Sequence, residues 1–434
     1  MDVTTVRGAR EVLGSQFTIN KLPIKNRIVL GPMSVLRPTD DGRPSGQTIA
    51  FFRRRAAGGV GLIIVGGSVA TERAWRESPF SPNLRFDKDE FVADLKRLTD
   101  AVHEHGTPVF AQLFPSFGRM GVPRDGHQIS AASPKPVSIG VAGLPDHVYV
   151  PGGRITPAPH EATVEEIKGI EADVVAAARR AKAAGFDGLE IGAHMCYFYS
   201  SFLSPLSNQR TDEYGGSAEN RARALRDAVA AVRAEVGPDY PIGIRMSVND
   251  HMPGGQGPEG WAEVASHIVP AGVDFISLSE GNYESLGENL PTPSGNMLAH
   301  GEPQAFRKAL GDGVRLFLSS TPAPQQAADA ITAGHVDATM LARQLLADPD
   351  FPTKVIDGRE SDVVWCDQAN SCMRSLMLGV PVHCHKNREM GREDPGAVQA
   401  NFGQNLAVWA AGNRVLMGMA DKAARLAQKR KRKR

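Results

Sequence analysis

Several residues stand at the ends of short apolar runs, where their side chains or backbone could take part in chemistry. They are Ser34, Gly66, Gln112, Tyr197, Arg245, Tyr283, Ser319, Ser320 and Arg343. An amide offers hydrogen-bond donors and acceptors, a guanidinium supplies a fixed positive charge, and a phenol can transfer a proton. If the runs are parallel strands of one barrel, these residues meet at the face where barrel enzymes carry their active sites.

The most informative stretch is FLSPLSNQRTDEYGGSAENRAR, residues 202–223, which follows the strand-like segment GFDGLEIGAHMCYFYS. Its aromatic, Ser, Asn, Arg and Asp side chains can form hydrogen bonds across a long ordered loop. Gly215 and Gly216 permit a sharp turn. Ser217 stands where a helix N-cap is expected, and Glu219 falls in the first helical turn, where the helix dipole favours an acidic residue. The stretch predicts a strand, an ordered loop and then a helix.

Strand and helix patterns alternate through residues 28–350. The apolar runs are Ile28–Met33, Gly61–Ser68, Pro108–Phe114, Gly188–His194, Pro241–Ser247, Asp274–Ser279, Val314–Ser320 and Asp337–Leu345. The helical patterns are Gln47–Ala57, Asp89–His105, Thr163–Ala184, Ser217–Val236, Pro258–Val269, Glu302–Leu310 and Ala323–Ala333. Eight such units predict an α/β protein with a closed (β/α)₈ barrel, the TIM barrel. A doubly wound open sheet is the alternative, but no G-x-G-x-x-G turn follows the first strand.

Three segments exceed what a barrel needs. The leader Met1–Lys25 is expected to lie against the lower face of the barrel. Pro115–Pro159 is a Gly- and Pro-rich excursion after the third strand, and its length predicts a loop that covers the pocket. Residues 351–434 form a C-terminal extension that contains a cysteine cluster, a predicted helix at Asn413–Gln428 and a basic tail. The expected division is therefore a barrel at 1–350 and an extension at 351–434.

The composition excludes several classes of protein. The chain has 434 residues, of which 41% are hydrophobic and 22% charged, as in an ordinary globular protein. Its net charge is +1, and removing the six basic residues Lys429–Arg434 leaves −5, so a nucleic-acid partner is not expected. We read the tail as a solvated terminus. There is no apolar stretch of membrane-spanning length and no signal core, which predicts a cytoplasmic protein without a membrane partner. The four cysteines are expected to be thiols or metal ligands.

The chain resembles the Old Yellow Enzyme family of FMN-dependent oxidoreductases over residues about 20–390. The resemblance is strongest to the branch with 2,4-dienoyl-CoA reductase, 2-enoate reductase and trimethylamine dehydrogenase. It rests on the ordered motifs KNRIVLGPM, VFAQL, FDGLEI, FLSPLSNQRTDEYGGSAENR, PIGIRMS and LARQLLADPD. The NQRTDEYGGSAENR part is highly specific, whereas GIRMS or AQL alone would mean little. The resemblance implies an FMN-binding barrel with NAD(P)H as electron donor.

The resemblance also implies roles for the residues at the strand ends. Gln112 would bond the pyrimidine edge of the flavin, and Arg245 would lie near N1 and O2, where a cation stabilises negative charge on the reduced ring. Pro32, Met33 and Ser34 would pass under the ring, Gly66 would allow close backbone approach, and Ser319, Ser320, Ala342 and Arg343 would hold the phosphate. Taken alone, an Arg at a strand end is more often part of an ion pair and a lone Gln a surface amide.

Proton transfer is where the chain departs from much of the family. A His-x-x-His or His-x-x-Asn pair on the fourth strand usually grips the substrate carbonyl, but the ungapped register here gives Gly192 and Met195. Tyr197 keeps the position of the family's acidic tyrosine and would protonate the substrate; otherwise it is a packing aromatic, as Tyr199 would be. His194 would be a carbonyl ligand under a shifted register, or else a strand-end histidine. Tyr283, Glu284 and His251 are further residues that could reach the pocket.

The cysteines are a second departure. The branch binds a [4Fe–4S] cluster through C-x2-C-x2-C-x11-C, and the chain has Cys366, Ala369, Cys372 and Cys384 at those places. A three-cysteine cluster with Asp367 or His385 as fourth ligand is one reading, and relic thiols are the other. The chain stops where these relatives continue into FAD- and pyridine-nucleotide-binding domains. Electrons would then reach FMN directly from NAD(P)H or through an electron-transfer protein.

Three functions remain open on this basis. The first is an FMN-dependent reductase of activated C=C bonds in an enone, enoate or enoyl or dienoyl thioester. The second is an amine dehydrogenase or demethylase of the trimethylamine dehydrogenase type. The third is a non-catalytic flavin-binding subunit, against which the retention of Gln112, Arg245 and Tyr197 argues. All three expect a small-molecule ligand, and a homo-oligomer is compatible with each.

Overall fold

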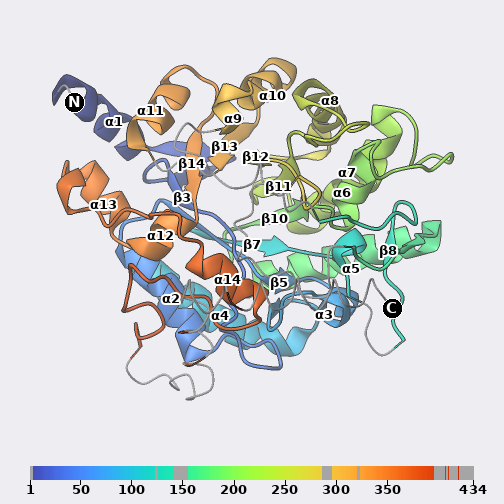
Figure 1. Ribbon diagram of the computed structural model, residues 1–434, viewed down its shortest axis with the longest axis horizontal. Coiled ribbons are helices and arrows are strands. Elements are labelled where there is room, and N and C mark those ends of the chain that lie inside the picture. The colour runs from blue at the N-terminus through green and yellow to red at the C-terminus, as the bar shows by residue number, and fades with distance from the viewer. Residues whose placement is uncertain are drawn as a thin grey trace.

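Eight parallel strands form a closed barrel in the computed structural model (Figure 1), which describes residues 3–122, 126–139, 155–285, 296–319 and 323–394 and the single positions 406, 409 and 419. The strands are β3 (Ile28–Leu30), β4 (Leu62–Val65), β7 (Val109–Leu113), β10 (Gly188–Ala193), β11 (Ile242–Ser247), β12 (Phe275–Ser279), β13 (Arg315–Ser319) and β14 (Ala338–Leu341). Pairing of β14 with β3 closes the ring. The predicted (β/α)₈ barrel is confirmed, and its strands are apolar because both of their faces are buried.

Helices surround the barrel on its outside (Figure 1). They are α2 (Gly46–Ala57), α4 (Val92–His103), α5 (Val164–Ala183), α7 (Ala218–Val236), α8 (Pro258–Ile268), α10 (Glu302–Leu310) and α11 (Pro324–Thr332). Each lies within a few residues of its predicted range. The eighth apolar run is the exception, because β14 ends at Leu341 and α12 (Arg343–Ala347) begins two residues later. Apolar content alone could not separate a short buried strand from the buried helix that follows it.

The informative stretch at residues 202–223 is an ordered loop that leads into α7, as predicted. Asn208 Nδ2 donates hydrogen bonds to the carbonyl oxygens of Phe202 and Tyr214, both at 2.8 Å. Ser217 is the N-cap of α7 and accepts a hydrogen bond from the backbone N–H of Asn220 at 3.2 Å. Gly216 has a φ of 81°, a conformation that favours glycine. Short polar side chains therefore fix the path between β10 and α7.

The N-terminal segment closes the lower end of the barrel, which confirms the expectation for the leader. After α1 (Val3–Gly14), the strands β1 (Phe17–Ile19) and β2 (Leu22–Ile24) form an antiparallel hairpin. The Phe17 ring meets that of Phe317 edge-on, with centroids 6.2 Å apart and planes at 87°. Phe317 in turn stacks on Phe275 inside the barrel. The hairpin therefore plugs the barrel with aromatic side chains.

The excursion after β7 contributes to the opposite, upper end. Its described parts include the 3₁₀ turn η2 (Gly118–Met120) and the two-residue strand β8 (Ser130–Ala131), which pairs with β9 (His160–Glu161). Phe117, Met120, Val137 and Ile139 pack in one buried cluster with Tyr197 and Tyr283. Residues 123–125 and 140–154 lie outside the described residues. The described part of the excursion thus covers the end of the barrel at which the pocket is predicted.

The C-terminal extension is tied to the barrel by buried polar contacts. Arg55 of α2 forms an ion pair with Glu393 at 2.7 Å, and both side chains are buried. Arg37 Nη2 donates to the carbonyl oxygen of Val382 at 2.8 Å. The extension includes α13 (Phe351–Ile356), η4 (Glu360–Asp362) and α14 (Ser371–Met377). Apart from the single position 419, the predicted helix at Asn413–Gln428 lies outside the described residues, as does the basic tail Lys429–Arg434.

The remaining short elements connect the main ones. They are β5 (Ser68–Val69), α3 (Glu72–Glu77), β6 (Leu84–Arg85), η1 (Asp89–Phe91), α6 (Phe198–Leu203), η3 (Val269–Ala271) and α9 (Asn296–Ala299). In the part of the chain that the structure describes, no helix combines the length and the apolar character needed to cross a membrane.

The aromatic plug makes a testable contribution to stability. We expect Phe17→Ala to lower the free energy of unfolding by about 3–5 kcal/mol, because it removes a buried ring from the lower end of the barrel. Thr18→Ala, on the exposed side of the same strand, is the control and should change it by less than about 0.5 kcal/mol. Urea unfolding followed by circular dichroism measures both. Equal effects of the two substitutions would show that the plug is not part of the core.

Candidate active site

A buried polar layer lies inside the barrel near its upper end. Glu190 of β10 is fully buried and accepts a hydrogen bond from Gln112 Nε2 at 2.6 Å, and its other oxygen accepts one from the Ser277 hydroxyl. Burial raises the pKa of the Glu190 carboxyl, while the positive charge of Arg245 opposes this. Burial also lowers the pKa of Arg245, against the effect of Glu190. The two charges therefore compensate each other in a region with little water.

Glu190 was missed as a site residue in the sequence, although it lies within the motif FDGLEI. The available signal was a carboxylate in the middle of a strand that is otherwise apolar on both faces. Its partners come from three other strands, β7, β11 and β12, so their proximity could not be read from local spacing.

Arg245 also faces a cavity that reaches the C-terminal extension. The cavity is lined by Pro32, Arg245, Ser319, Ala342, Arg343 and Cys366, among others. Five of these six residues were predicted to bind cofactor. Arg245 Nε is buried and has no hydrogen-bond partner among the described residues, which is costly unless a ligand accepts from it. The cavity therefore ends at a guanidinium that is available for a polar ligand.

The segment at Pro32–Ser34 is held close to the end of β4. A Cβ atom added to Gly66 would lie 2.5 Å from the Pro32 Cβ and 2.6 Å from the Met33 backbone nitrogen. Gly67, with a φ of 70°, would meet the Ser34 Cα at 2.8 Å. The backbone at Gly66 therefore lies in close contact with the segment Pro32–Ser34. The role of Gly66 beside the flavin stays a prediction.

The predicted phosphate end of the site lies at the start of α12. Arg343 is the first residue of this helix, and its Nη1 donates to Asn370 Oδ1 at 2.9 Å. Burial lowers the pKa of Arg343, and the nearby Cys372 and Cys366 oppose that effect. Ser319 is buried at the end of β13, with its hydroxyl bonded to the Leu278 carbonyl. Ser320 lies outside the described residues, so its role stays a prediction.

Two tyrosine hydroxyls meet close to Arg245. Tyr197 Oη and Tyr283 Oη are 2.9 Å apart and both residues are buried. Burial raises the pKa of Tyr197 to about 12, which the bond to Tyr283 moderates. Burial also raises the pKa of Tyr283 well above its ordinary value. Both phenols are therefore protonated at neutral pH, as a proton donor requires.

His194 belongs to the same group of rings. Its ring meets that of Tyr197 edge-on, with centroids 5.4 Å apart. Burial, followed by the charge of Arg245, holds the pKa of His194 well below its usual value, so the imidazole is neutral. Its Nδ1 is buried without a partner among the described residues. The structure thus brings together the three predicted catalytic residues His194, Tyr197 and Tyr283.

Phe114 explains why no histidine can stand at position 192. A Cβ atom added to Gly192 would lie only 2.5 Å from the Phe114 ring. The backbone then turns through two left-handed residues, Met195 and Cys196, with φ of 57° and 66°. Such conformations are unfavourable for side-chain-bearing residues and cluster at functional sites. They place Tyr197 beside the rings of Phe114 and Phe117.

The other candidates from the sequence have different surroundings. Tyr199 is buried in α6, and its hydroxyl has no hydrogen-bond partner among the described residues, which fits a packing aromatic. Glu284 does not point at Tyr197; it accepts two hydrogen bonds from Arg119 of the excursion, at 2.9 and 3.2 Å. His251 lies in a separate group with Glu280, His300 and Glu302.

The three C-terminal cysteines act on one another electrostatically. Burial raises the pKa of Cys372 to about 11; Arg343 lowers it, and Cys366 and Cys384 raise it. Asp367 and His385, which were predicted as alternative fourth ligands, form a hydrogen bond with each other, with His385 Nε2 2.9 Å from Asp367 Oδ2. The [4Fe–4S] cluster stays a prediction.

Comparison with known proteins gives the class. A family model described as the NADH:flavin oxidoreductase / NADH oxidase family matches residues 15–362, and the chain belongs to this family. This confirms the resemblance to Old Yellow Enzyme, and membership implies FMN and NAD(P)H-linked oxidoreductase chemistry. The matched range includes all eight strands of the barrel.

Three relatives illustrate the relationship. The chain is 35% identical to a metal reductase of Desulforamulus reducens, over 88% of this chain and 54% of that protein. It is 32% identical to a cinnamate reductase of Clostridium sporogenes, over 88% and 56%. A solved structure of 2-naphthoyl-CoA reductase with 2-naphthoyl-CoA superimposes with a TM-score of 0.79 at 28% identity, over 88% and 58%. The chain thus spans little more than half the length of these three relatives.

The buried tyrosine can be tested by titration. Because the pKa of Tyr197 is raised to about 12, we expect its phenol to stay protonated in the folded protein at about pH 11, above the ordinary tyrosine pKa of about 10. The unfolded chain releases this proton near pH 10 and the folded protein near pH 12, so the group makes the fold less stable as pH rises from about 10 to about 12.

The measurement is phenolate absorbance of the wild type minus that of Tyr197→Phe, with circular dichroism confirming that both remain folded. The difference should be near zero at about pH 11 and equal one phenolate after unfolding in urea. A full phenolate from Tyr197 in the folded protein would contradict the burial described here.

Proposed function

We propose that this protein is an FMN-dependent reductase of activated C=C bonds, with Tyr197 as the proton donor. The single observation that carries the proposal is the position of Arg245. Its side chain lines the cavity, and its charge also acts on the pKa of His194 and on that of Tyr197. Arg245 would thus serve two purposes: it would bind negative charge in the cavity, and it would act on the pKa of the proposed proton donor.

The residues of the cavity fit FMN. Arg245 offers an unpartnered Nε, and Arg343 offers a second cation near the start of α12, where helix N–H groups also attract anions. We infer that Arg343, Ser319 and Ala342 hold the phosphate and that Arg245 and Gln112 bind the ring. When bound, FMN would supply hydride chemistry, taking two electrons from NAD(P)H and giving them to the substrate.

The protein itself would position the substrate and supply the proton. Tyr197 Oη would give its proton to the α-carbon of the alkene, and Tyr283 Oη, 2.9 Å away, would hold the phenol in place. His194, kept neutral by burial and by Arg245, can donate one hydrogen bond from its ring N–H to a substrate carbonyl. This arrangement would replace the His pair that Gly192 and Met195 cannot provide.

The lining around Tyr197 supports an apolar, unsaturated substrate. Phe114, Phe117 and Met120 surround the phenol, and Met377 of α14 belongs to the same buried cluster. Aromatic rings and methionines exclude water and favour flat, polarisable groups. The cinnamate and 2-naphthoyl-CoA reductases among the relatives are named for conjugated substrates. We therefore propose a conjugated enoate or enoyl thioester, with NAD(P)H or an electron-transfer protein as donor.

Anaerobic titration tests the proposal against the two others. The visible spectrum is recorded while NADH or NADPH is added, followed by an enone or enoate, and separately while an amine is added alone. Bleaching by NAD(P)H and recovery with the alkene support the reductase. Bleaching by the amine alone supports an amine dehydrogenase, and no bleaching by any of them supports a binding subunit. A broad absorbance beside the flavin bands would report an iron–sulfur cluster.

Substitution of the proton donor gives the sharper prediction. We expect Tyr197→Phe to slow reoxidation by the alkene about 10²- to 10⁴-fold, because a positioned general acid contributes a factor of that size. Reduction by NAD(P)H should be unchanged, since that step needs no proton from Tyr197. Stopped-flow absorbance follows the two half-reactions separately.

The control is Tyr199→Phe, which removes another buried phenol hydroxyl two residues away that has no hydrogen-bond partner among the described residues. It should leave both half-reactions unchanged. If Tyr197→Phe reoxidises as fast as Tyr199→Phe, the proton comes from another group.

A further inference from the structure

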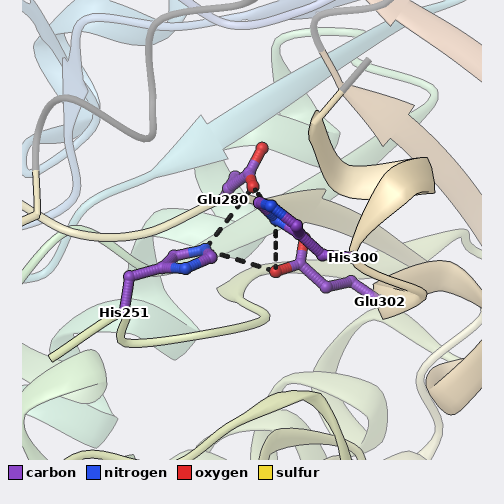
Figure 2. Close-up of side chains that lie close together, drawn as sticks. All are labelled: His251, Glu280, His300 and Glu302. Carbon is purple, nitrogen blue, oxygen red and sulfur yellow. Dashed lines mark hydrogen bonds and ion pairs between the residues drawn. The ribbon is translucent and has the colours of Figure 1, made fainter. Parts of the chain in front are cut away.

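Four metal-binding side chains converge at the upper end of the barrel, outside the flavin cavity (Figure 2). They are His251 after β11, Glu280 directly after β12, and His300 and Glu302 at the start of α10. One ligand atom from each lies within 4.8 Å of all the others. Among the described residues this is the group that meets the geometric requirement for a metal site.

The distances between these atoms match one coordination shell. His251 Nε2 lies 3.3 Å from Glu302 Oε1 and 3.4 Å from Glu280 Oε1. His300 Nδ1 lies 3.0 Å from Glu280 Oε1 and 3.8 Å from Glu302 Oε1. Ligands bound tetrahedrally at about 2.0–2.2 Å from Zn²⁺ are about 3.3–3.6 Å apart. The four His–Glu distances, 3.0–3.8 Å, are thus close to this spacing, and all four atoms lie within 4.8 Å of one another.

Unsatisfied buried atoms point independently to a missing ligand. Glu302 is fully buried, and its Oε2 has no hydrogen-bond partner among the described residues. His251 Nε2 is also buried and, although close to both carboxylates, makes no hydrogen bond of good geometry. A buried carboxylate without full compensation is unfavourable, and a divalent cation would compensate it.

The surroundings orient the ligands as at known metal sites. Asn249 Nδ2 donates to Glu302 Oε1 at 3.0 Å, and Asn249 Oδ1 accepts the backbone N–H of His251 at 3.0 Å. The second bond supports the left-handed backbone of His251, whose φ is 50°. Such supporting hydrogen bonds fix ligand orientation. His300 is 40% exposed, so an ion can enter from solvent.

We propose that His251, Glu280, His300 and Glu302 bind one divalent transition-metal ion of the Zn²⁺ type. Two imidazoles disfavour Ca²⁺ and Mg²⁺, which prefer oxygen ligands. Two carboxylates neutralise the charge of the ion, and four protein ligands define a structural site. The ion would join the ends of β11 and β12 to α10. Because Glu280 is three residues before Tyr283, it would also fasten the loop that carries this tyrosine.

Protonation of His251 is the alternative to metal binding at this site. Burial lowers the pKa of His251, but Glu280 and Glu302 outweigh this and raise it to about 9. An imidazolium held between two carboxylates would then need no metal. Direct measurement of metal binding separates the two cases.

The test uses the full-length protein after dialysis against a chelator. Zn²⁺ binding is measured by calorimetry, and bound zinc by mass spectrometry, for the wild type, His300→Gln and Cys372→Ser. The proposal expects one Zn²⁺ per wild-type chain, at least about tenfold weaker binding by His300→Gln, and retention of this ion by Cys372→Ser. Hydrogen exchange of residues 279–285 should slow with Zn²⁺ in the wild type and in Cys372→Ser, and not in His300→Gln.

Several results would overturn the proposal. They are absence of stoichiometric Zn²⁺ binding by the wild type, equal affinity of His300→Gln, and loss of all binding in Cys372→Ser. The last would place the ion at the cysteines. His300 is the most exposed of the four ligands, so its substitution is the least disruptive to folding. The measurement does not depend on FMN, and its outcome is separate from that of the proposed reductase activity.

Discussion

The charge of Arg245 inside the barrel mouth is the constraint on which the site depends. A guanidinium that leaves water must be compensated, because the desolvation of an ion costs several kcal/mol. Glu190 supplies part of the compensation, and Gln112 and Ser277 hold its carboxylate in place. Arg245 Nε has no hydrogen-bond partner among the described residues, so the cost of burying the guanidinium is only partly offset, and a bound ligand would offset more of it. Four strands contribute to this arrangement, so the closed barrel is what makes it possible.

The charge of Arg245 also affects the side chains of His194 and Tyr197. Burial lowers the pKa of His194, the charge of Arg245 adds to this effect, and the same charge lies close enough to Tyr197 to act on its pKa. The aromatic rings of Phe114 and Phe117 pack against the phenol, and the ring of Phe114 occupies the space that a side chain at position 192 would need. Tyr283 is held by a loop whose neighbouring Glu284 pairs with Arg119 of the excursion. The excursion and the loop after β12 therefore support one hydroxyl pair.

The sequence predicted those parts of the molecule that depend on local pattern. Eight apolar runs and seven helical patterns were sufficient for the barrel, and Ser217 marked the start of α7 through its capping chemistry. The end of β14 was placed too late, since a buried strand and a buried helix are both apolar. Strand-end polarity, together with the family motifs, also pointed to five of the residues that line the cavity: Pro32, Arg245, Ser319, Ala342 and Arg343.

What the sequence could not show are contacts between distant segments. Glu190 meets Gln112 across 78 residues, and no spacing rule predicts that contact. The ligand atoms of His251, after β11, and of Glu302, at the start of α10, lie 3.3 Å apart across 51 residues of sequence, and neither His251 nor His300 is in a metal-binding motif. Glu284 follows Tyr283 in the chain, but its side chain pairs with Arg119, which lies 165 residues away. Side-chain direction is a property of the assembled barrel.

The most direct test of the central claim is FMN binding to the isolated protein, measured by quenching of flavin fluorescence. We predict that the wild type binds one FMN per chain and that Arg245→Met binds it at least about tenfold more weakly, which corresponds to about 1.4 kcal/mol. Arg245→Lys, which retains the charge, should fall between the two. A colourless wild type that does not take up FMN, or an Arg245→Met variant with unchanged affinity, would contradict the account.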